Sequence, residues 1–419
     1  MELQFLGGAR EVGRSAVLVN GALLLDFGLK TADPPQYPVG SIRADGPASD
    51  PDAVVVSHGH LDHAGAVPAL LAGDARPPVH WTPPTRDLAL RLCEDTLKLH
   101  GGTPQCPFTR EDLRRVTEVS ETHGYRAPFE AAGHRVELFD AGHIPGSAHV
   151  LVDDGDTRLL YTGDFYAGGR GQRLVAPSTA RPEADVVVTE STYADVAHKS
   201  RERVEERFVE RVRTTLWEGG TVVVPAFAVG RTQELMLVCA AHDIDCYVDG
   251  MGVEVTSLLR RHPEFLRDAD AMSQAASNAR FVDGRDGQCR RIADQSTVII
   301  TTAGMLGGGP AVTYLPEIRA NPTNALLFSG YQVEGTPGRR ILETGSAEVG
   351  DRHLQVSATV EAFDFSAHAD RDGLLEFLEA YRDTPLLVNH GDACEWFADD
   401  LESRGHDARA PAVGETIEV

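Results

Sequence analysis

The stretch SHGHLDH at residues 57–63 decides how the rest of this chain is interpreted. It follows the apolar, β-branched run 53–56, which predicts a buried strand, and it precedes the apolar stretch 64–71, where a helix is expected to begin. The side chains in it that can bind a metal are His58, His60, Asp62 and His63. Imidazoles suit zinc, and a carboxylate among them can serve a second cation. The stretch therefore predicts a rigidly held metal site rather than a solvated, histidine-rich turn.

Three further predicted strands are followed by residues of the same kind, Asp26, His143 and Asp164. Asp26 is expected to orient a ligand or the metal-bound water. Gly142 and Gly146 allow the backbone around His143 to approach closely, so this histidine is predicted to supply a third nitrogen. A carboxylate placed like that of Asp164 is a natural bridge between two divalent cations.

Length and composition favour a globular protein of two or three domains, since the chain has 419 residues and 42% of them are hydrophobic. The sequence has no secretory leader pattern and no window of eighteen uninterrupted apolar residues, so no membrane partner is expected. Its 6 cysteines form no C-x-x-C pair, which favours reduced thiols. These features predict a cytoplasmic protein.

The formal net charge of −24 is unusual, and only Lys30, Lys98 and Lys199 are lysines among 39 basic residues. Such a surface repels itself in dilute buffer. Acid-rich, lysine-poor chains resemble those of salt-loving organisms, in which concentrated salt screens the repulsion. A net negative charge normally counts against a nucleic-acid partner. In molar salt, contacts between basic side chains and phosphates contribute little to affinity in any case, so the charge is weaker evidence against nucleic-acid binding.

The middle of the chain predicts a separate domain. A helix is expected over Arg201–Trp217, and strands followed by glycine-containing loops recur at 221–235, 297–310 and 325–332. Strands that alternate with helical patterns indicate a parallel sheet inserted into the first domain. The Pro- and Gly-rich stretch 34–51 is predicted to be a loop.

These residues follow one another in the order Asp26, the cluster at 58–63, His143 and Asp164. This order and spacing resemble the metallo-β-lactamase fold, a four-layered αβ/βα sandwich that binds two zinc ions. Glu190 after a further strand, His368 within FSAHAD (365–370) and His390 after the strand at 386–388 complete a resemblance to the β-CASP nucleases. The phrases EVGRS (11–15), GRTQE (230–234) and SGYQ (329–332) are closer to the cleavage and polyadenylation factor branch, with its archaeal relatives, than to ribonuclease J.

The resemblance covers essentially the whole chain and implies an α/β protein. Its metallo-β-lactamase domain would occupy 1–195 and 346–419, with a β-CASP insert at 196–345. Met1 leads almost directly into the first predicted strand, so the N-terminal KH domains of some archaeal relatives are expected to be missing. Asp392 departs from the family, which often has Glu at this position.

The resemblance also implies an activity, zinc-dependent hydrolysis of RNA as an endonuclease, a 5′–3′ exonuclease or both. One zinc would be held by His58, His60 and His143, the other by Asp62, His63 and His390, with Asp164 bridging. Asp62 would orient the nucleophile, and His368, supported by Glu190, would serve the leaving 3′ oxygen. RNA contacts are predicted at Arg231, Ser329, Tyr331, Arg339 and Ser366.

Three other functions remain open from the sequence. A DNA-directed β-CASP nuclease would share the zinc site. A small-molecule metallohydrolase would need the first domain but not the insert, and a non-catalytic subunit of a processing complex would not need its ligand positions filled, as they all are here. RNA is the expected partner, and further RNA-processing subunits and a homodimer are left open.

Overall fold

The computed structural model describes residues 1–31, 35–39, 51–103, 105–169, 171–284 and 287–419, which form two compact units. The first unit comprises Met1–Gly168, Pro177–Ala197 and His368–Val419, and the second comprises Gly169–Ala176 and His198–Ala367. The loop predicted over 34–51 lies mostly outside the described residues.

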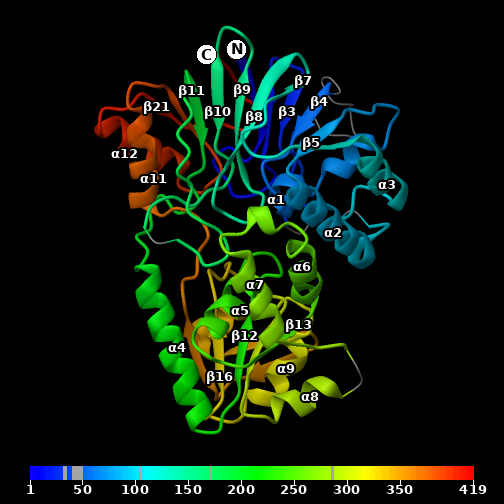
Figure 1. Cartoon of the computed structure of the whole chain (residues 1–419), viewed down its shortest axis with the longest axis vertical. Helices are drawn as coiled ribbons and strands as arrows, with labels where there is room; N and C mark the ends of the chain where they lie inside the picture. Colours follow the sequence, from blue (N-terminus) through cyan, green and yellow to red (C-terminus); the bar gives the residue numbers. More distant parts are fainter. Residues whose placement is uncertain (32–34, 40–50, 104, 170, 285–286) are drawn as a thin grey trace. The chain divides into compact units, whose positions relative to one another are not determined.

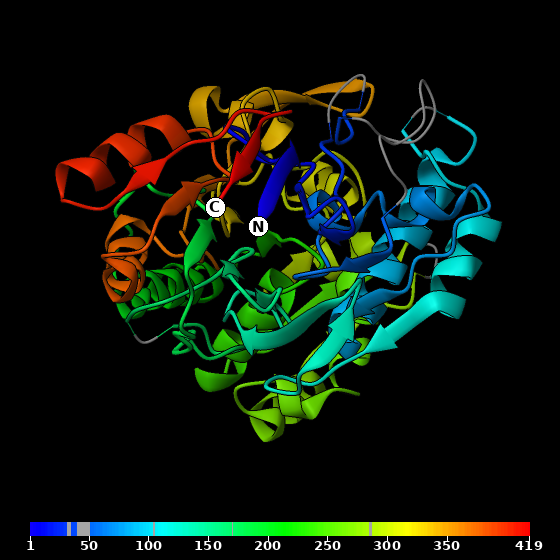
Figure 2. The same cartoon turned by 90° about the horizontal axis from the view of Figure 1, so that it is seen from above.

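The first unit is built on two seven-stranded sheets, ordered β22-β1-β2-β3-β4-β5-β6 and β21-β20-β11-β10-β9-β8-β7. The strands of the first sheet are β1 (Glu2–Gly7), β2 (Ala16–Val19), β3 (Leu23–Leu25), β4 (Ala53–Val55), β5 (Val79–Trp81), β6 (Ser120–Thr122) and β22 (Thr416–Glu418). Those of the second are β7 (Phe129–Ala131), β8 (His134–Asp140), β9 (Ala148–Asp153), β10 (Arg158–Tyr161), β11 (Val186–Thr189), β20 (Leu386–Val388) and β21 (Ala408–Arg409). Strand β1 pairs with β22, so the two chain ends lie together (Figure 2).

Alternation along the strands gives each sheet two apolar faces. Val55 of β4 packs in the core between the sheets, together with Val150 and Val188 of the second sheet. Its neighbour Val54 faces the opposite way, toward helix residues such as Ala89. The second sheet also buries its outer face, against side chains of two C-terminal helices.

Helices cover the two outer faces: α11 and α12 lie on one side of the sheets and α2 and α3 on the other (Figure 1). The helices of this unit are α1 (Leu61–Ala64), α2 (Pro83–His100), α3 (Arg110–Val119), α11 (Arg371–Leu378) and α12 (Cys394–Ser403), with 3₁₀ turns at Val67–Leu71 and Glu379–Tyr381. The result is the predicted four-layered αβ/βα sandwich. The helix expected after the 57–63 stretch occurs in two short pieces, because Pro68 has no N–H to continue the ladder and its ring would clash with the carbonyl of Ala64.

The second unit contains a six-stranded parallel sheet ordered β14-β13-β15-β12-β16-β19, as the alternating pattern predicts. Its strands are β12 (Val222–Pro225), β13 (Cys246–Asp249), β14 (Arg280–Phe281), β15 (Val298–Thr301), β16 (Ala325–Phe328) and β19 (Thr359–Ala362), and β17 (Ser346–Val349) and β18 (Arg352–Gln355) form a separate hairpin. Its helices are α4 (Arg201–Trp217), α5 (Arg231–Ala241), α6 (Met251–Leu259), α7 (Ala269–Asn278), α8 (Gln288–Ala293), α9 (Ala311–Ile318) and α10 (Pro337–Thr344), with a 3₁₀ turn at Pro263–Phe265.

Both faces of this sheet are covered, which explains why its strands are continuous apolar runs. Val222 and Val224 pack with α4, α5 and α7, whereas Val223 packs with α8, α9 and α10. The segment 346–367 belongs to this unit, although the sequence-based division places it in the first domain, because β19 pairs with β16. Among the described residues, no helix is both long and apolar enough to cross a bilayer.

Candidate metal centre

The seven predicted metal ligands lie in the first unit, in segments that follow the carboxyl ends of strands, and two of them, Asp62 and His63, lie in the short helix α1. The 57–63 stretch follows β4, and His143, Asp164 and His390 follow β8, β10 and β20. Strands β10, β11 and β20 are mutually parallel, and β8 runs in the same direction as β10 because both pair antiparallel with β9. Their carboxyl ends therefore lie at the same end of the second sheet, where His143, Asp164 and His390 come together.

The first group of side chains contains three histidines and one carboxylate oxygen, and it could hold one metal ion. His60 Nδ1 lies 3.1 Å from His58 Nε2 and 3.1 Å from His143 Nε2. The carboxylate oxygen Oδ2 of Asp164 lies 3.5 Å from His58 Nε2 and 3.9 Å from His143 Nε2. Three ring nitrogens and an oxygen around one point are a donor set that zinc accepts.

The second group uses the other oxygen of the same carboxylate. Asp164 Oδ1 lies 3.3 Å from His63 Nε2 and 3.5 Å from His390 Nε2. His390 Nε2 is in turn 3.7 Å from Asp62 Oδ2. Asp164 thus presents one oxygen to each group, the arrangement expected of a bridge between two cations.

Unsatisfied atoms indicate that this cluster suits a cation. His63 Nε2 and Asp164 Oδ1 are buried, and neither has a hydrogen-bond partner among the described residues. A buried polar atom without a partner costs free energy that a bound ion would recover. The residues present therefore fit a divalent metal.

The side chain of Asp26, which the sequence predicts to orient a ligand, contacts the ring nitrogen of His63 that faces away from Asp164. Its Oδ2 lies 2.6 Å from His63 Nδ1, on the ring nitrogen opposite to the one that faces Asp164. Oδ1 of Asp26 accepts a hydrogen bond from the backbone N–H of Ser57, at 2.6 Å. With Nδ1–H donated to Asp26, the imidazole of His63 presents the lone pair of Nε2 to the centre.

Two supporting residues are absent from the sequence-based set. The hydroxyl of Tyr161 donates to Asp26 Oδ2 at 2.8 Å, although the two residues are 135 positions apart. Ser15 Oγ lies 2.7 Å from His390 Nδ1, across 375 positions. The only sequence signals are their places at the end of a strand and in the EVGRS phrase, and neither specifies a partner.

Burial and charge set the protonation of the ring nitrogens. Burial lowers the pKa of His58 well below its usual value and that of His60 to about 4, which keeps both imidazoles neutral. Burial alone would also lower the pKa of His63, but the carboxylates of Asp164 and Asp26 outweigh it and raise that pKa well above its usual value. Without an ion, a proton supplies the positive charge that the carboxylates favour there, and a bound cation would take its place.

His368 and Glu190 form a pair beside the metal cluster. Both carboxylate oxygens of Glu190 lie close to His368 Nδ1, at 3.2 and 3.1 Å, and Glu190 also accepts a 2.7 Å hydrogen bond from the N–H of Phe165. The other ring nitrogen, Nε2, lies 4.0 Å from Asp164 Oδ2. Burial would lower the pKa of His368, but Glu190 and Asp164 raise it to about 9. Without a metal ion, these carboxylates favour the protonated imidazole, whose Nε2 faces the cluster.

The residues predicted to contact RNA differ in accessibility. Tyr331 is exposed, and the guanidinium of Arg339 is paired with Glu343 at 2.5 Å. Ser329 is buried and donates to the carbonyl of Pro225. The two others also make local bonds within the second unit: the guanidinium of Arg231 donates to the carbonyl of Phe365, and the carbonyl of Ser366 accepts from Arg201. Tyr331 can meet a ligand in its present position, whereas Arg339 would first have to leave Glu343, and all five contacts stay predictions.

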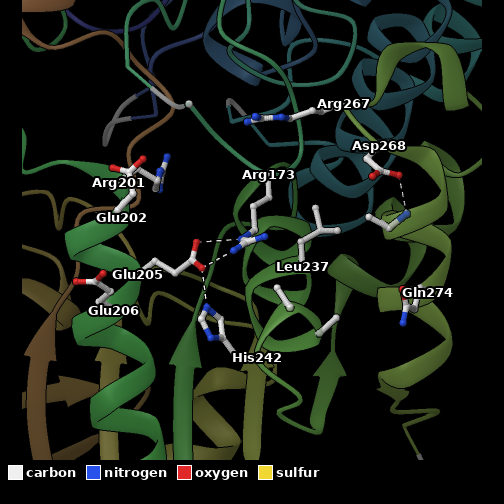
Figure 3. Close-up of a pocket in the computed structure, with 14 residues that line it drawn as sticks. Arg173, Arg201, Glu202, Glu205, Glu206, Leu237, His242, Arg267, Asp268 and Gln274 are labelled. Carbon is white, nitrogen blue, oxygen red and sulfur yellow. Dashed lines mark hydrogen bonds and ion pairs between the residues drawn. The ribbon is translucent and has the colours of Figure 1, made fainter.

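A pocket of about 440 Å³ lies within the second unit (Figure 3). Arg173 donates to both oxygens of Glu205, at 2.5 and 2.9 Å, and His242 Nε2 lies 2.7 Å from the same carboxylate. Arg173 and His242 together make three contacts with the Glu205 carboxylate. This network stabilises the unit and leaves the carboxylate little capacity for a ligand.

Three family models match parts of the chain. Residues 9–178 match the metallo-beta-lactamase superfamily, 232–341 match the Beta-Casp domain, and 353–411 match a Zn-dependent metallo-hydrolase RNA specificity domain. A probable RNase MJ4 of Methanocaldococcus jannaschii is 33% identical over an alignment of 438 residues, which covers 100% of both chains. The chain belongs to the β-CASP family of metallo-β-lactamase proteins.

Two further relatives are named as an RNase and as a transcription termination factor. RNase aCSPSF2 of Saccharolobus solfataricus is 35% identical over 92% of this chain and 78% of that protein, and transcription termination factor FttA of Pyrococcus abyssi is 33% identical over 99% and 70%. A crystal structure of a protein of unknown function from Enterococcus faecalis has the same fold, with a TM-score of 0.64 over 99% of both chains at 13% identity. The expected family, fold class and metal-dependent hydrolase class are confirmed.

Proposed function

We propose that this chain is a zinc-dependent ribonuclease that hydrolyses RNA phosphodiester bonds in RNA processing or decay. The observation that carries the proposal is the carboxylate of Asp164, which presents one oxygen to each of two histidine-containing groups. The RNA specificity domain match and the relatives named as RNases support RNA as the substrate.

The proposal assigns two zinc ions to the chain. His58, His60 and His143 would hold one ion, Asp62, His63 and His390 would hold the other, and Asp164 could contribute to both. When bound, two such ions lower the pKa of a shared water and polarise the phosphoryl oxygen.

The protein's own groups perform the remaining tasks. The carboxylate of Asp62, at the start of α1, accepts a hydrogen bond from the attacking water and so orients it. His368 gives the proton from Nε2 to the leaving 3′ oxygen, because Glu190 occupies its Nδ1. Asp26 fixes the ring of His63 and does not touch the substrate.

The substrate contacts of this proposal lie at Tyr331, which can stack a base, and at Arg339, which can pair with a phosphate after leaving Glu343. Further processing subunits, a homodimer and a cytoplasmic location stay predictions, as do the contacts at the three less accessible positions.

Incubation with labelled nucleic acids tests the function. Purified protein in concentrated KCl is mixed with RNA and DNA of one sequence, each labelled at the 5′ or the 3′ end, with Asp164→Asn as the control for a contaminating nuclease. Cleavage of RNA that needs zinc and is lost in the control supports the proposal. Preferential cleavage of DNA would instead identify the chain as a DNA-directed nuclease. RNA binding without cleavage by the zinc-loaded protein would indicate a non-catalytic subunit.

The same reactions separate the two modes of cutting. An endonuclease yields internal fragments of defined length at the earliest times, from either labelled end. A 5′–3′ exonuclease releases the 5′ label as mononucleotides and is blocked by a hairpin at the 5′ end. We expect the internal fragments, the 5′ products or both, whereas release of the 3′ label alone would contradict both modes.

A further inference from the structure

A second cluster of metal-binding side chains lies at the edge of the first sheet, and it shares no residue with the centre described above. His80 in β5 is the register partner of Glu121 in the edge strand β6. His123 follows two residues after Glu121, so both side chains project to the same face. His80 Nδ1 lies 3.0 Å from His123 Nε2 and 3.6 Å from a carboxylate oxygen of Glu121.

The surroundings of this cluster limit its freedom. His80 is buried, and the ring of Phe129 from β7 stacks on that of His123, with ring centres 3.6 Å apart and planes within 7°. The same phenyl ring stacks on His80 at 5.0 Å. Two imidazoles and one aromatic ring thus form a rigid group, while the exposed carboxylate of Glu121 can adjust its position.

The protonation of the two histidines leaves lone pairs for a ligand. Burial outweighs the effect of Glu121 and lowers the pKa of His80 to about 4, and burial also lowers the pKa of His123. Two neutral imidazoles beside a carboxylate are the donor set of zinc sites with three protein ligands.

We propose that His80, Glu121 and His123 form an additional site for a divalent metal such as zinc. Zinc–nitrogen bonds of about 2.0–2.1 Å at a tetrahedral angle place two nitrogens about 3.3 Å apart. The observed separations of 3.0 and 3.6 Å lie on either side of this value, so only small shifts of the side chains are needed. Water would complete the coordination on the exposed side of Glu121.

The role of this site is structural, because its ligands tie an edge strand to its neighbour. Among the described strands, β6 pairs with β5 alone, and the N–H of His123 already donates to the carbonyl of Trp81 at 2.9 Å. A metal held by His80 and His123 would join the same two strands through side chains, and Phe129 of the second sheet would cover the ion. The alternative is a simple hydrogen bond between the two imidazoles.

Metal analysis separates these alternatives. The full-length protein and its His123→Gln and Glu121→Gln variants are loaded with zinc, dialysed against metal-free buffer and measured for zinc per chain. His100→Gln is the matched control, because His100 is an exposed histidine at the end of α2 in the same unit. The proposal expects the wild-type protein and the control to retain about one ion more than either variant, and RNA cleavage to be the same in all four.

A second readout protects the test against a folding defect. Glu121 is exposed, so its change to Gln leaves the core intact and keeps the comparison valid even if His123→Gln unfolds. Zinc should raise the melting temperature of metal-stripped wild-type protein by more than it raises that of Glu121→Gln. Equal zinc content in wild-type protein and folded Glu121→Gln, with equal shifts in melting temperature, overturns the proposal and leaves the hydrogen-bonded pair.

Discussion

Asp26 Oδ2 lies 2.6 Å from His63 Nδ1, while the opposite nitrogen of the same ring lies 3.3 Å from Asp164. The ring is therefore held between a carboxylate that sets its tautomer and a carboxylate that faces the metal groups. Asp26 has a backbone φ of +58°, a conformation that aspartate and asparagine tolerate better than most residues.

The first prediction follows from this arrangement. Asp26→Asn keeps the backbone conformation, but its amide cannot accept from His63, Ser57 and Tyr161 at once, because one end of it is a donor. We expect zinc affinity at this centre to fall about 10- to 100-fold. Competition with a chelating dye measures the change, and Tyr161→Phe, which removes one donor only, should have the smaller effect. An unchanged affinity in Asp26→Asn would show that its hydrogen bonds do not support the metal.

The second prediction concerns the ligands themselves. Zinc-loaded wild-type protein should carry about two ions at this centre, and Asp62→Ala and His63→Ala should each lose metal and abolish cleavage, since one group of ligands is then incomplete. Elemental analysis alongside an RNA cleavage assay measures both. The exposed variant His100→Gln serves as the control. Active protein without metal would contradict the assignment.

The third prediction separates proton transfer from metal binding. His368→Ala should lower the cleavage rate on the order of a hundredfold or more, as expected for loss of a positioned proton donor, and should leave the zinc content intact. Glu190→Gln should slow cleavage less, because His368 remains present but loses its carboxylate partner. Loss of zinc from His368→Ala would instead make this histidine a ligand or a determinant of the fold.

Much of the centre was accessible from sequence because its ligands are concentrated. Four of them fall within 58–63, and His143 and Asp164 each follow a predictable strand, so local patterns pointed to these six. His390 was added only by the resemblance to the β-CASP nucleases; the structure places all seven side chains together, and their binding of metal stays a prediction. The supporting hydroxyl of Tyr161 was not accessible from sequence, because its approach to Asp26 depends on how the two sheets pack across 135 positions. The pair His80 and His123 was missed for a similar reason, since their contact depends on the register between β5 and β6.

The boundary of the inserted sheet shows another limit of sequence patterns. The run Thr359–Ala362 is short and only half-buried, and its place is decided by parallel pairing with β16 rather than by any local signal. The split of the helix after the 57–63 stretch was more visible, because Pro68 is present in the sequence. Local rules thus locate elements, while long-range pairing decides where an element belongs.

The fourth prediction uses the network around Glu205 in the second unit. Burial would raise the pKa of Glu205, but hydrogen bonds from Arg173 and His242 outweigh it and hold that pKa below its usual value of 4.5. A carboxylate with a lowered pKa stabilises the fold above the unfolded-state value, and this stabilisation is lost as pH falls through the folded-state value.

Glu205→Gln should therefore destabilise the protein by about 1.5–3 kcal/mol near neutral pH, the usual contribution of hydrogen bonds to a charged group. The difference in unfolding free energy between wild-type and variant should shrink as pH falls below about 4.5. Denaturant titrations at several pH values measure it, and Glu206→Gln on the same pocket wall is the control. A difference that grows on acidification would mean that Glu205 is not held as an anion.

The fifth prediction concerns salt. With a net charge of −24 and three lysines, repulsion between carboxylates should destabilise the fold in dilute buffer. Screening shortens the range of this repulsion from about 10 Å at 0.1 M salt to about 3 Å at 1 M. The melting temperature should therefore rise as KCl is added, and a circular dichroism melt at each concentration measures it.

As KCl is added, RNA cleavage should change in the same direction as the melting temperature, rather than fall through loss of RNA affinity. An ordinary nuclease binds less RNA as salt rises, because each phosphate neutralised by a basic side chain contributes to the decline. In this chain, binding should depend instead on the metal centre, on local arginines such as Arg339 and on stacking at Tyr331, so activity should persist or increase toward molar KCl. Parallel titrations of RNA cleavage and melting provide the test. Protein that is fully folded and most active near roughly 0.1 M salt, and steeply inhibited above it, would show that adaptation to salt is the wrong reading of the composition and that basic groups dominate RNA binding.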